Sequence, residues 1–295
     1  MAKLKIDLNF SLKRLDLVTK GLVTTKFLGN YASAFKGQGL EFADYRNYAQ
    51  GTDDASRIDW KASQRVNNLL VKEFVEERNM EILFLVDVSE KMLAGSTKQL
   101  KAEYVAEMVA ALSYSMLSAG DAVGLVLFSD KIVKFVHPQS GMKQVYTITE
   151  SLANTNNYGS FSDIDLAVDH AFRNIEKGTL VILISDFIYP IKSEKNFRLA
   201  SSKFDLISVM VRDPIDMNLP EGSGEVVAQD PVSGEVLLIN PAKMRKEYGS
   251  MAASDVTKIR NLMKKSGGDL LFVETSKPFV KPVIEFFKKR EAEWR

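Results

Sequence analysis

The chain has 295 residues, a hydrophobic content of 45%, a charged content of 26% and a formal net charge of +1. This is the composition of an ordinary globular protein, and the near-zero net charge argues against nucleic acid or an anionic membrane as a partner. The chain contains no cysteine, which excludes disulfides, thiolate metal sites and cysteine nucleophiles.

The first 36 residues predict neither a signal peptide nor a membrane anchor. They lack an apolar signal core, and no window of the chain approaches 18 apolar residues. We therefore expect a cytoplasmic protein without a membrane span. The segment is basic, with seven basic and two acidic residues. Leu8, Leu12, Leu15 and Val18 have the spacing of an amphipathic helix, whose basic face either is solvated or contacts an acidic partner.

Residues 37–79 alternate closely in charge and predict a compact, irregular unit. A turn is expected over 51–54 and a short helix over 56–60. The adjacent carboxylates Asp53 and Asp54 permit two interpretations, a catalytic pair or a cap and ion pair with nearby arginines, and the second is favoured. We expect three side chains to hold this unit against the rest of the chain, with a partner-docking surface as the alternative: Arg46, Arg57 and Trp60.

From Met80 onward, apolar strands alternate with amphipathic helices. The five consecutive apolar residues 82–86 end in a polar loop, which is typical of a buried strand in a parallel sheet. Further strands are expected over 122–128, 131–136, 180–184, 204–211 and 269–273, helices over 98–117, 142–152, 162–175, 241–265 and 278–290, and a hairpin over 224–239. Strand 131–136 should pair antiparallel at the edge of the sheet. The predicted fold class is α/β, a doubly wound and mainly parallel sheet over 80–295 with a smaller N-terminal subdomain over 1–79.

Polar residues follow the two most apolar strands at the point where each strand ends. Asp87 and Ser89 follow the first strand, and Ser185 and Asp186 follow the strand 180–184. The loop before the helix 162–175 can bring Ser162 to the same edge of the sheet. Carboxylate and hydroxyl oxygens suit a magnesium-type cation. For Asp87 and Ser89 alone, a simple capped turn is the alternative.

These segments resemble the metal-ion-dependent adhesion site of von Willebrand factor A domains. The preceding motifs GLEFADYRNY (39–48), GTDD (51–54), RIDWK (57–61) and EER (76–78) resemble the bacterial and archaeal family known as domain of unknown function fifty-eight. The resemblance runs from about Leu12 to the C-terminus. It implies a von Willebrand factor A-like, Rossmann-type fold and a site for Mg²⁺ or Mn²⁺. The implied ligands are Asp87, Ser89, Ser162 and Asp186, with Asp163 as a further candidate.

The resemblance also implies a role in protein interaction. Members of that family are usually not enzymes, and they are thought to work beside MoxR-type AAA+ ATPases in the assembly or maturation of other complexes. Many members carry N-terminal membrane helices, and this chain does not. We therefore expect a non-enzymatic adaptor with a MoxR-type AAA+ ATPase as its protein partner.

One departure from the family pattern concerns the metal site. Lys91 stands where the pattern has a second serine, and a charged lysine offers no lone pair to a metal. We expect its ammonium to face Asp87 and Asp186 and to weaken or abolish cation binding. The alternative is that Lys91 points to solvent and a water takes the missing ligand position. Ser162 replaces the usual threonine but keeps the hydroxyl.

An enzymatic interpretation stays open as the alternative function. In it, Asp87 is the nucleophile of a magnesium-dependent phosphoryl transfer. Phosphatases of the haloacid dehalogenase type have a second aspartate two residues later, where this chain has Ser89, so the general acid is missing. The sequence also has no Walker loop, no dinucleotide fingerprint and no Gly-x-Ser-x-Gly elbow.

Overall fold

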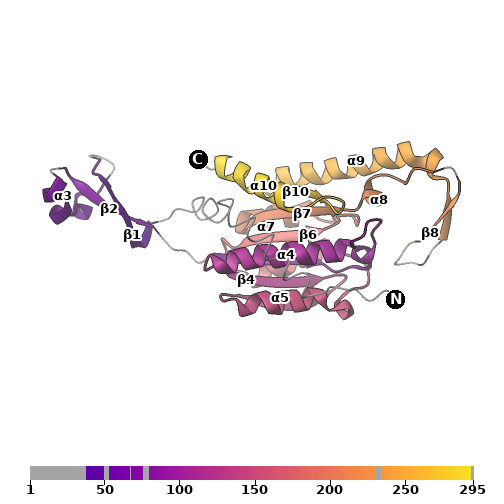
Figure 1. Cartoon of the computed structure of the whole chain (residues 1–295), viewed down its shortest axis with the longest axis horizontal. Helices are drawn as coiled ribbons and strands as arrows, with labels where there is room; N and C mark the ends of the chain where they lie inside the picture. Colours follow the sequence, from indigo (N-terminus) through magenta and orange to yellow (C-terminus); the bar gives the residue numbers. More distant parts are fainter. Residues whose placement is uncertain are drawn as a thin grey trace.

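The computed structural model describes residues 38–49, 53–66, 68–75, 80–222, 224–229, 234 and 236–293. The amphipathic helix predicted over residues 8–18 lies outside these ranges. The described residues form a large sheet domain, a small N-terminal unit and a two-stranded hairpin (Figure 1).

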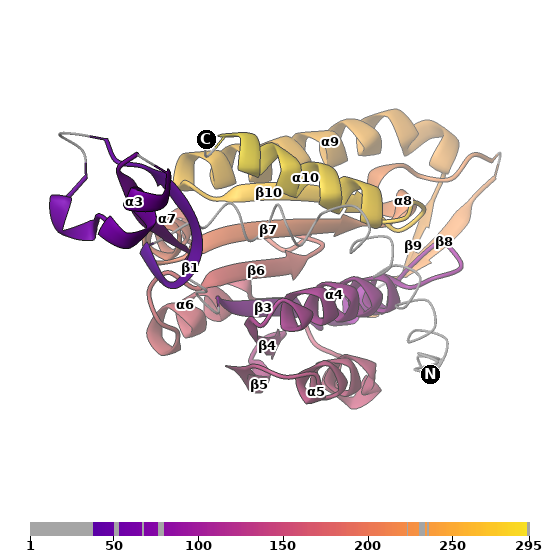
Figure 2. The ribbon, with the colours of Figure 1, turned by 60° about the vertical axis from the view of Figure 1, so that its left-hand side comes forward.

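The core of the protein is a six-stranded sheet with the strand order β10-β7-β6-β3-β4-β5, and Figure 2 shows these strands one below another with α4 in front of them. The strands are β3 (Glu81–Asp87), β4 (Ala122–Phe128), β5 (Ile132–Gln139), β6 (Leu180–Ser185), β7 (Asp205–Arg212) and β10 (Asp269–Glu274). Strand β5 pairs antiparallel with β4 at one edge, and the other neighbours pair parallel. This arrangement confirms the predicted fold class and the antiparallel edge strand.

Helices cover both faces of the sheet, which explains why its central strands are apolar throughout. In β3, Ile82, Phe84 and Val86 point to one face and Leu83 and Leu85 to the other, and all are buried. Three helices pack on the first face: α4 (Lys101–Ser118), α5 (Lys143–Ala153) and α10 (Val280–Glu293). Three pack on the second: α6 (Ile164–Asn174), α7 (Glu194–Lys203) and α9 (Pro241–Ser266). The result is a three-layer sandwich of the doubly wound type.

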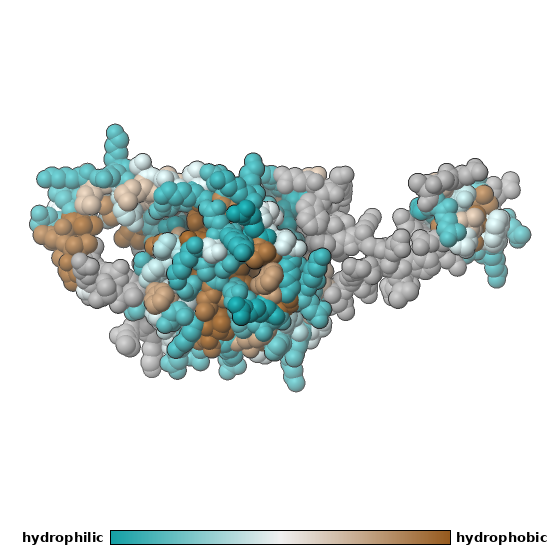
Figure 3. All heavy atoms as spheres, turned by 180° about the vertical axis from the view of Figure 1, so that it is seen from behind, coloured by the Kyte–Doolittle hydropathy of each residue, from teal (hydrophilic) through white to brown (hydrophobic). Residues whose placement is uncertain are grey.

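Helix α7 is the longest described helix of this domain that the sequence pattern did not predict. Only Phe197 and Ala200 of its residues are buried, so its apolar stripe is too short to register as a helical period. The expected hairpin is present as β8 (Val226–Gln229) and β9 (Val236–Ile239). It exposes Val227, Leu237 and Leu238, and a hydrophobic patch is visible at that end of the molecule in Figure 3. Among the described helices, none combines the length and apolarity needed to cross a bilayer.

The N-terminal unit consists of β1 (Gln38–Asn47), the short helices η1 (Ala55–Arg57) and α3 (Trp60–Val66), and β2 (Leu70–Val75). Its two strands pair antiparallel. As predicted, its adjacent carboxylates stabilise a turn: Asp54 accepts a hydrogen bond from the backbone N–H of Ser56, and Asp53 forms an ion pair of 2.5 Å with Arg46.

Two of the side chains expected to join this unit to the sheet domain have other surroundings. Arg46 pairs with Asp53 inside its own unit, and Trp60 is 63% exposed. Figure 1 shows the unit standing away from the sheet. The exposure of Trp60 contradicts the prediction that its side chain holds the two parts together. For Arg46 the prediction stays open, and the side chain of Arg57 lies outside what the structure describes.

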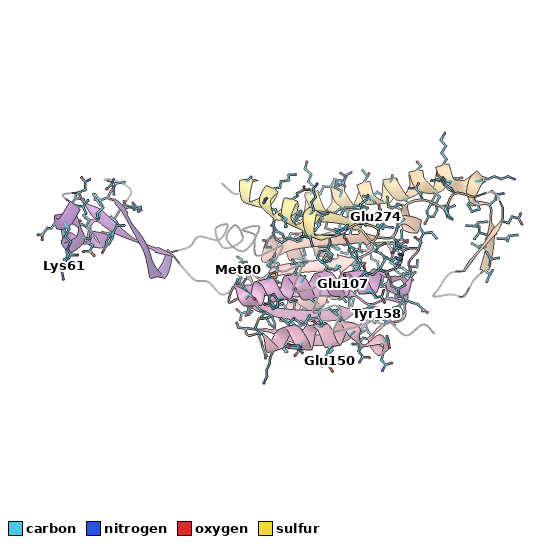
Figure 4. The ribbon with its side chains drawn as sticks, in the orientation of Figure 1. Lys61, Met80, Glu107, Glu150, Tyr158 and Glu274 are labelled. Carbon is cyan, nitrogen blue, oxygen red and sulfur yellow. The ribbon has the colours of Figure 1, made fainter. Side chains whose placement is uncertain are left out.

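The parallel strands give the sheet domain two unlike ends. Figure 4 labels Met80, which precedes β3, at one end, and Tyr158 at the other, where β3, β6 and β7 finish. Loops that leave the carboxyl ends of parallel strands meet at one edge, which is where such folds bind ligands.

Candidate functional site

The structure brings the predicted residues of three loops together around Asp87. The Ser162 hydroxyl donates a hydrogen bond of 2.7 Å to Oδ2 of Asp87, and the Ser185 hydroxyl donates one of 2.6 Å to the same oxygen. The backbone N–H of Ser89 donates to Oδ1 at 2.8 Å. We call this group the strand-end site, which consists of Asp87, Ser89, Ser162, Ser185 and Asp186.

The strand-end site is buried. Asp87, Ser89, Ser185 and Asp186 are 0% exposed, and Ser162 is 5% exposed. Burial and then the charge of Asp186 raise the pKa of Asp87, while its hydrogen bonds from Ser185, Ser162 and Ser89 partly offset that rise. A cation bound nearby would therefore stabilise the Asp87 anion.

Ser89 carries an unsatisfied polar atom at the centre of the site. It precedes the short helix η2 (Glu90–Leu93) but forms no side-chain capping bond, so the capped-turn interpretation of Ser89 is wrong. Its buried hydroxyl oxygen has no hydrogen-bond partner among the described residues. Buried polar atoms are normally paired, and a free oxygen beside a carboxylate is the arrangement that a bound cation would satisfy.

Asp186 has a different environment, because a lysine occupies it. Lys101 is the first residue of α4, and its side chain is 1% exposed. Its Nζ lies 2.7 Å from Oδ2 of Asp186 and 3.0 Å from Oδ2 of Asp216 in α8 (Pro214–Met217). The other oxygen of Asp186 accepts a bond of 3.0 Å from the Ile188 N–H. Burial acts to lower the pKa of Lys101, but the two carboxylates outweigh it and raise the pKa, so the ammonium stays charged.

Lys91 and Asp163 do not join the site. The ammonium of Lys91 lies 4.3 Å from the ring centroid of Tyr189, a cation–π contact, so the prediction that it faces the two carboxylates is wrong. Asp163 caps α6 through the Leu166 N–H at 3.1 Å, and its second oxygen accepts a bond of 2.6 Å from Lys192. Both of its oxygens are therefore engaged elsewhere.

Two aromatic side chains and a lysine lie on the loops around the site, and of these Phe161 is exposed while Tyr189 and Lys91 are half-buried. Phe161 is 43% exposed and its ring centroid lies 6.3 Å from that of Tyr189, over which Lys91 stacks. We call Lys91, Phe161 and Tyr189 the rim. Two non-glycine residues of the same loops have left-handed backbones, Ser160 with φ 64° and Phe187 with φ 52°. Such strain collects at functional sites and is held there by surrounding contacts.

A third strand end extends the polar network, and the sequence analysis did not assign it to the site. Asp213 follows β7 and accepts bonds from the hydroxyls of Ser96 and Thr275 and from the Ile215 N–H. Burial acts to raise the pKa of Asp213, but these bonds lower it overall. Its own N–H donates to Asp216 at 2.9 Å. The sequence signal that could have identified Asp213 is its place directly after a third apolar strand, like Asp87 and Asp186 after theirs.

The oxygen set around Asp87 fits a hard cation, and the set around Asp186 does not. Asp87, Ser89, Ser162 and Ser185 offer one carboxylate and three hydroxyls, which suits magnesium or manganese. Asp186 differs from Asp87 because one of its oxygens is paired with the ammonium of Lys101, a positive charge that a cation would have to displace. Across the described residues, no group of three histidine, cysteine or acidic side chains forms a metal cluster, so any cation would depend on hydroxyl ligands.

The chain matches the model of a known protein family. Residues 44–258 match the model of the family described as protein of unknown function DUF58. The chain therefore belongs to that family, and its sheet domain has the doubly wound α/β fold expected from the sequence.

One relative and two solved structures resemble this chain at low sequence identity. An uncharacterized protein of Mycobacterium bovis, Mb1516, is 25% identical over 284 residues, 95% of this chain and 89% of that protein. An aerotolerance-related membrane protein from Bacteroides fragilis is 15% identical and covers 72% of this chain and 99% of its own, with a TM-score of 0.50. The SpRpn10 VWA domain also matches, over 70% of this chain and 94% of its own, at 11% identity and a TM-score of 0.39. Identities this low concern the fold alone.

Proposed function

We propose that this protein is a non-enzymatic interaction module, an adaptor that docks another protein over the carboxyl ends of β3 and β6. The rim supplies the contact surface, since it combines the exposed ring of Phe161 with the half-buried Tyr189 and a lysine, and aromatic residues contribute much of the binding energy at protein interfaces. The strand-end site beneath it ties the three loops together through Asp87.

One observation carries the choice between adaptor and enzyme, namely how Asp87 is used. Its side chain is fully buried and both of its oxygens accept hydrogen bonds, three in total. A carboxylate nucleophile needs an accessible oxygen within reach of its substrate. These features favour a structural and binding role over phosphoryl transfer.

The proposal includes a weakened site for Mg²⁺ or Mn²⁺ of the adhesion-site type. Asp87, Ser89 and Ser162 would hold the ion, with Ser185 beside them. When bound, the cation would supply positive charge that can attract a partner's carboxylate. The protein's own residues fix the three loops and present the rim whether or not a cation is bound.

For the partner, we propose a MoxR-type AAA+ ATPase, in the cytoplasm, with the pair acting in the assembly or maturation of other complexes. The motif resemblance supports this choice, as does the family membership. Co-expression with the MoxR-type ATPase encoded in the same genome, followed by size-exclusion chromatography with ATP, tests it. We expect the two proteins to elute together, and separate elution at micromolar concentrations would count against a direct complex.

The phosphoryl-transfer alternative has its own discriminating assay. Hydrolysis of a generic phosphate ester is measured with magnesium for the wild type and for Asp87→Asn. The adaptor proposal predicts no turnover by either protein. Turnover by the wild type that disappears in Asp87→Asn would reverse the choice.

A further inference from the structure

A buried lysine in the strand-end site has no explanation in packing alone. The Lys101 side chain is 1% exposed and makes ion pairs with Asp186 and Asp216. Buried ion pairs contribute little net stability, because the cost of removing the charges from water offsets their attraction. Lys101 is also the first residue of α4, and a positive charge is disfavoured at a helix N-terminus.

The position of Lys101 decides what Asp186 can bind. Its ammonium lies 2.7 Å from Oδ2 of Asp186, and the remaining oxygen accepts the Ile188 N–H. A lysine provides positive charge but no lone pair, so it can neutralise a carboxylate without coordinating a partner. A divalent cation at this carboxylate would have to displace the ammonium or bear its repulsion.

The two carboxylates of the strand-end site, Asp87 and Asp186, therefore differ in whether a positive charge is paired with them. On one side, Asp87 lies beside the unpaired hydroxyl of Ser89, and the charge of Asp186 acts on it. On the other side, Lys101 already balances Asp186 and links it to Asp216 in α8. The lysine that sequence reasoning placed in the site, Lys91, stacks on Tyr189 instead.

We propose that Lys101 is a resident cation of the strand-end site, which takes the place of a divalent ion at Asp186 and sets the affinity of the site for Mg²⁺ and Mn²⁺. This role of Lys101 extends the proposed function and rests on it in one respect, because it assumes that the strand-end site lies beneath a docking surface. Its consequence is that docking over the rim does not require a metal, since the second carboxylate is neutralised by the chain itself.

The test compares cation binding in the full-length chain and four variants. Lys101→Met removes the charge and keeps the length of the side chain. Lys101→Met with Asp216→Asn also removes a carboxylate, so that fewer buried charges are left unpaired, and we expect this variant to fold if Lys101→Met alone does not. Asp216→Asn alone and Lys91→Met are the matched controls. Calorimetric titration with Mn²⁺ and with Mg²⁺ gives the affinities, and the melting temperature with and without Mn²⁺ is an independent readout.

We expect both Lys101 variants to bind Mn²⁺ roughly tenfold more tightly than the wild type, or better, which corresponds to about 1.4 kcal/mol. Mn²⁺ should raise their melting temperatures and leave that of the wild type nearly unchanged. Lys91→Met and Asp216→Asn should bind as the wild type does. These differences would not arise if Lys101 only filled space.

Two results would overturn the role of Lys101. One is equal Mn²⁺ affinity in the wild type and the double variant, and the other is an absence of Mn²⁺ binding in every variant. Neither result bears on the docking proposal, which is tested by partner binding without added Mn²⁺. Loss of partner binding with the expected cation affinities would instead overturn the docking proposal and leave the role of Lys101 intact.

Discussion

At the scale of single residues, the sequence predicted the site residues that lie at strand ends but not the lysine that pairs with them. Asp87, Ser162 and Asp186 were predictable because the ends of parallel strands must meet at one edge of the sheet. Lys101 was not, because its partners Asp186 and Asp216 lie 85 and 115 residues away in the chain. The local pattern places Lys101 at the start of a helix but says nothing of which buried carboxylates it will reach.

Asp121 shows how a buried carboxylate makes stability depend on pH. It precedes β4, accepts the Met80 N–H at 2.9 Å through Oδ1, and leaves its buried Oδ2 without a partner among the described residues. Burial raises its pKa, and the Met80 bond offsets this only partly. The unfolded chain therefore ionises first as the pH rises above about 4, so this residue reduces the stability of the folded state from there upward until the folded pKa is passed.

We expect Asp121→Asn to match the wild type near pH 4 and to gain stability relative to it by pH 7. Each unit by which the pKa of Asp121 is raised corresponds to about 1.4 kcal/mol. Asp213→Asn is the control with the opposite sign, because the lowered pKa of Asp213 means that its anion stabilises the fold above about pH 4. Melting temperatures across this pH range are the measurement, and parallel curves for all three proteins would contradict the assignment.

At the scale of elements, predictability followed the length of the apolar pattern. Strand β4 lies where the sequence placed it, because its apolar run is buried on both faces. Helix α7 was missed because only Phe197 and Ala200 anchor it. The register shift between β4 and β5 beside Gly124 was also beyond prediction. It coincides with a close backbone approach, since a Cβ added at Gly124 would lie 2.8 Å from the carbonyl oxygen of Val136.

That close approach makes Gly124→Ala a test of the β4–β5 pairing. The neighbouring atoms belong to the backbone of Val136 and to Pro138, so they cannot move aside without shifting β5. We expect the free energy of unfolding to fall by about 1–3 kcal/mol. Gly222→Ala is the matched control, because no atom lies within 4 Å of its added Cβ. If urea denaturation showed the same small change for both variants, the tight contact would be refuted.

At the scale of the whole molecule, the sequence predicted the two parts but not their relation. A local sequence motif predicts the structure of its own segment. The packing of the N-terminal unit against the sheet domain depends on contacts between distant side chains, which no local motif predicts. Trp60 and Arg46 are the case in point, since the first is exposed and the second pairs within its own unit. The N-terminal unit therefore offers an exposed surface of its own.

We expect Trp60→Ser to leave the melting temperature of the sheet domain nearly unchanged, within roughly 0.5 kcal/mol of unfolding free energy. The side chain is 63% exposed, so little packing is lost. Calorimetry of the full-length chain measures this. A large drop in melting temperature would restore the interpretation in which Trp60 holds the two parts together. An unchanged melting temperature with loss of partner retention would instead identify the N-terminal unit as a second docking surface.

The central claim is that the rim over the strand-end site docks another protein. Its most direct test is the dissociation constant of the complex with the MoxR-type ATPase. Surface plasmon resonance with the ATPase immobilised gives this constant for the wild type, Phe161→Ser and Tyr146→Ser. Tyr146 is 62% exposed on α5, which contributes no residue to the strand-end site. We predict that Phe161→Ser weakens binding roughly tenfold or more, about 1.4 kcal/mol, and that Tyr146→Ser leaves it unchanged. Unchanged binding by Phe161→Ser, or an equal loss in both variants, would contradict the claim.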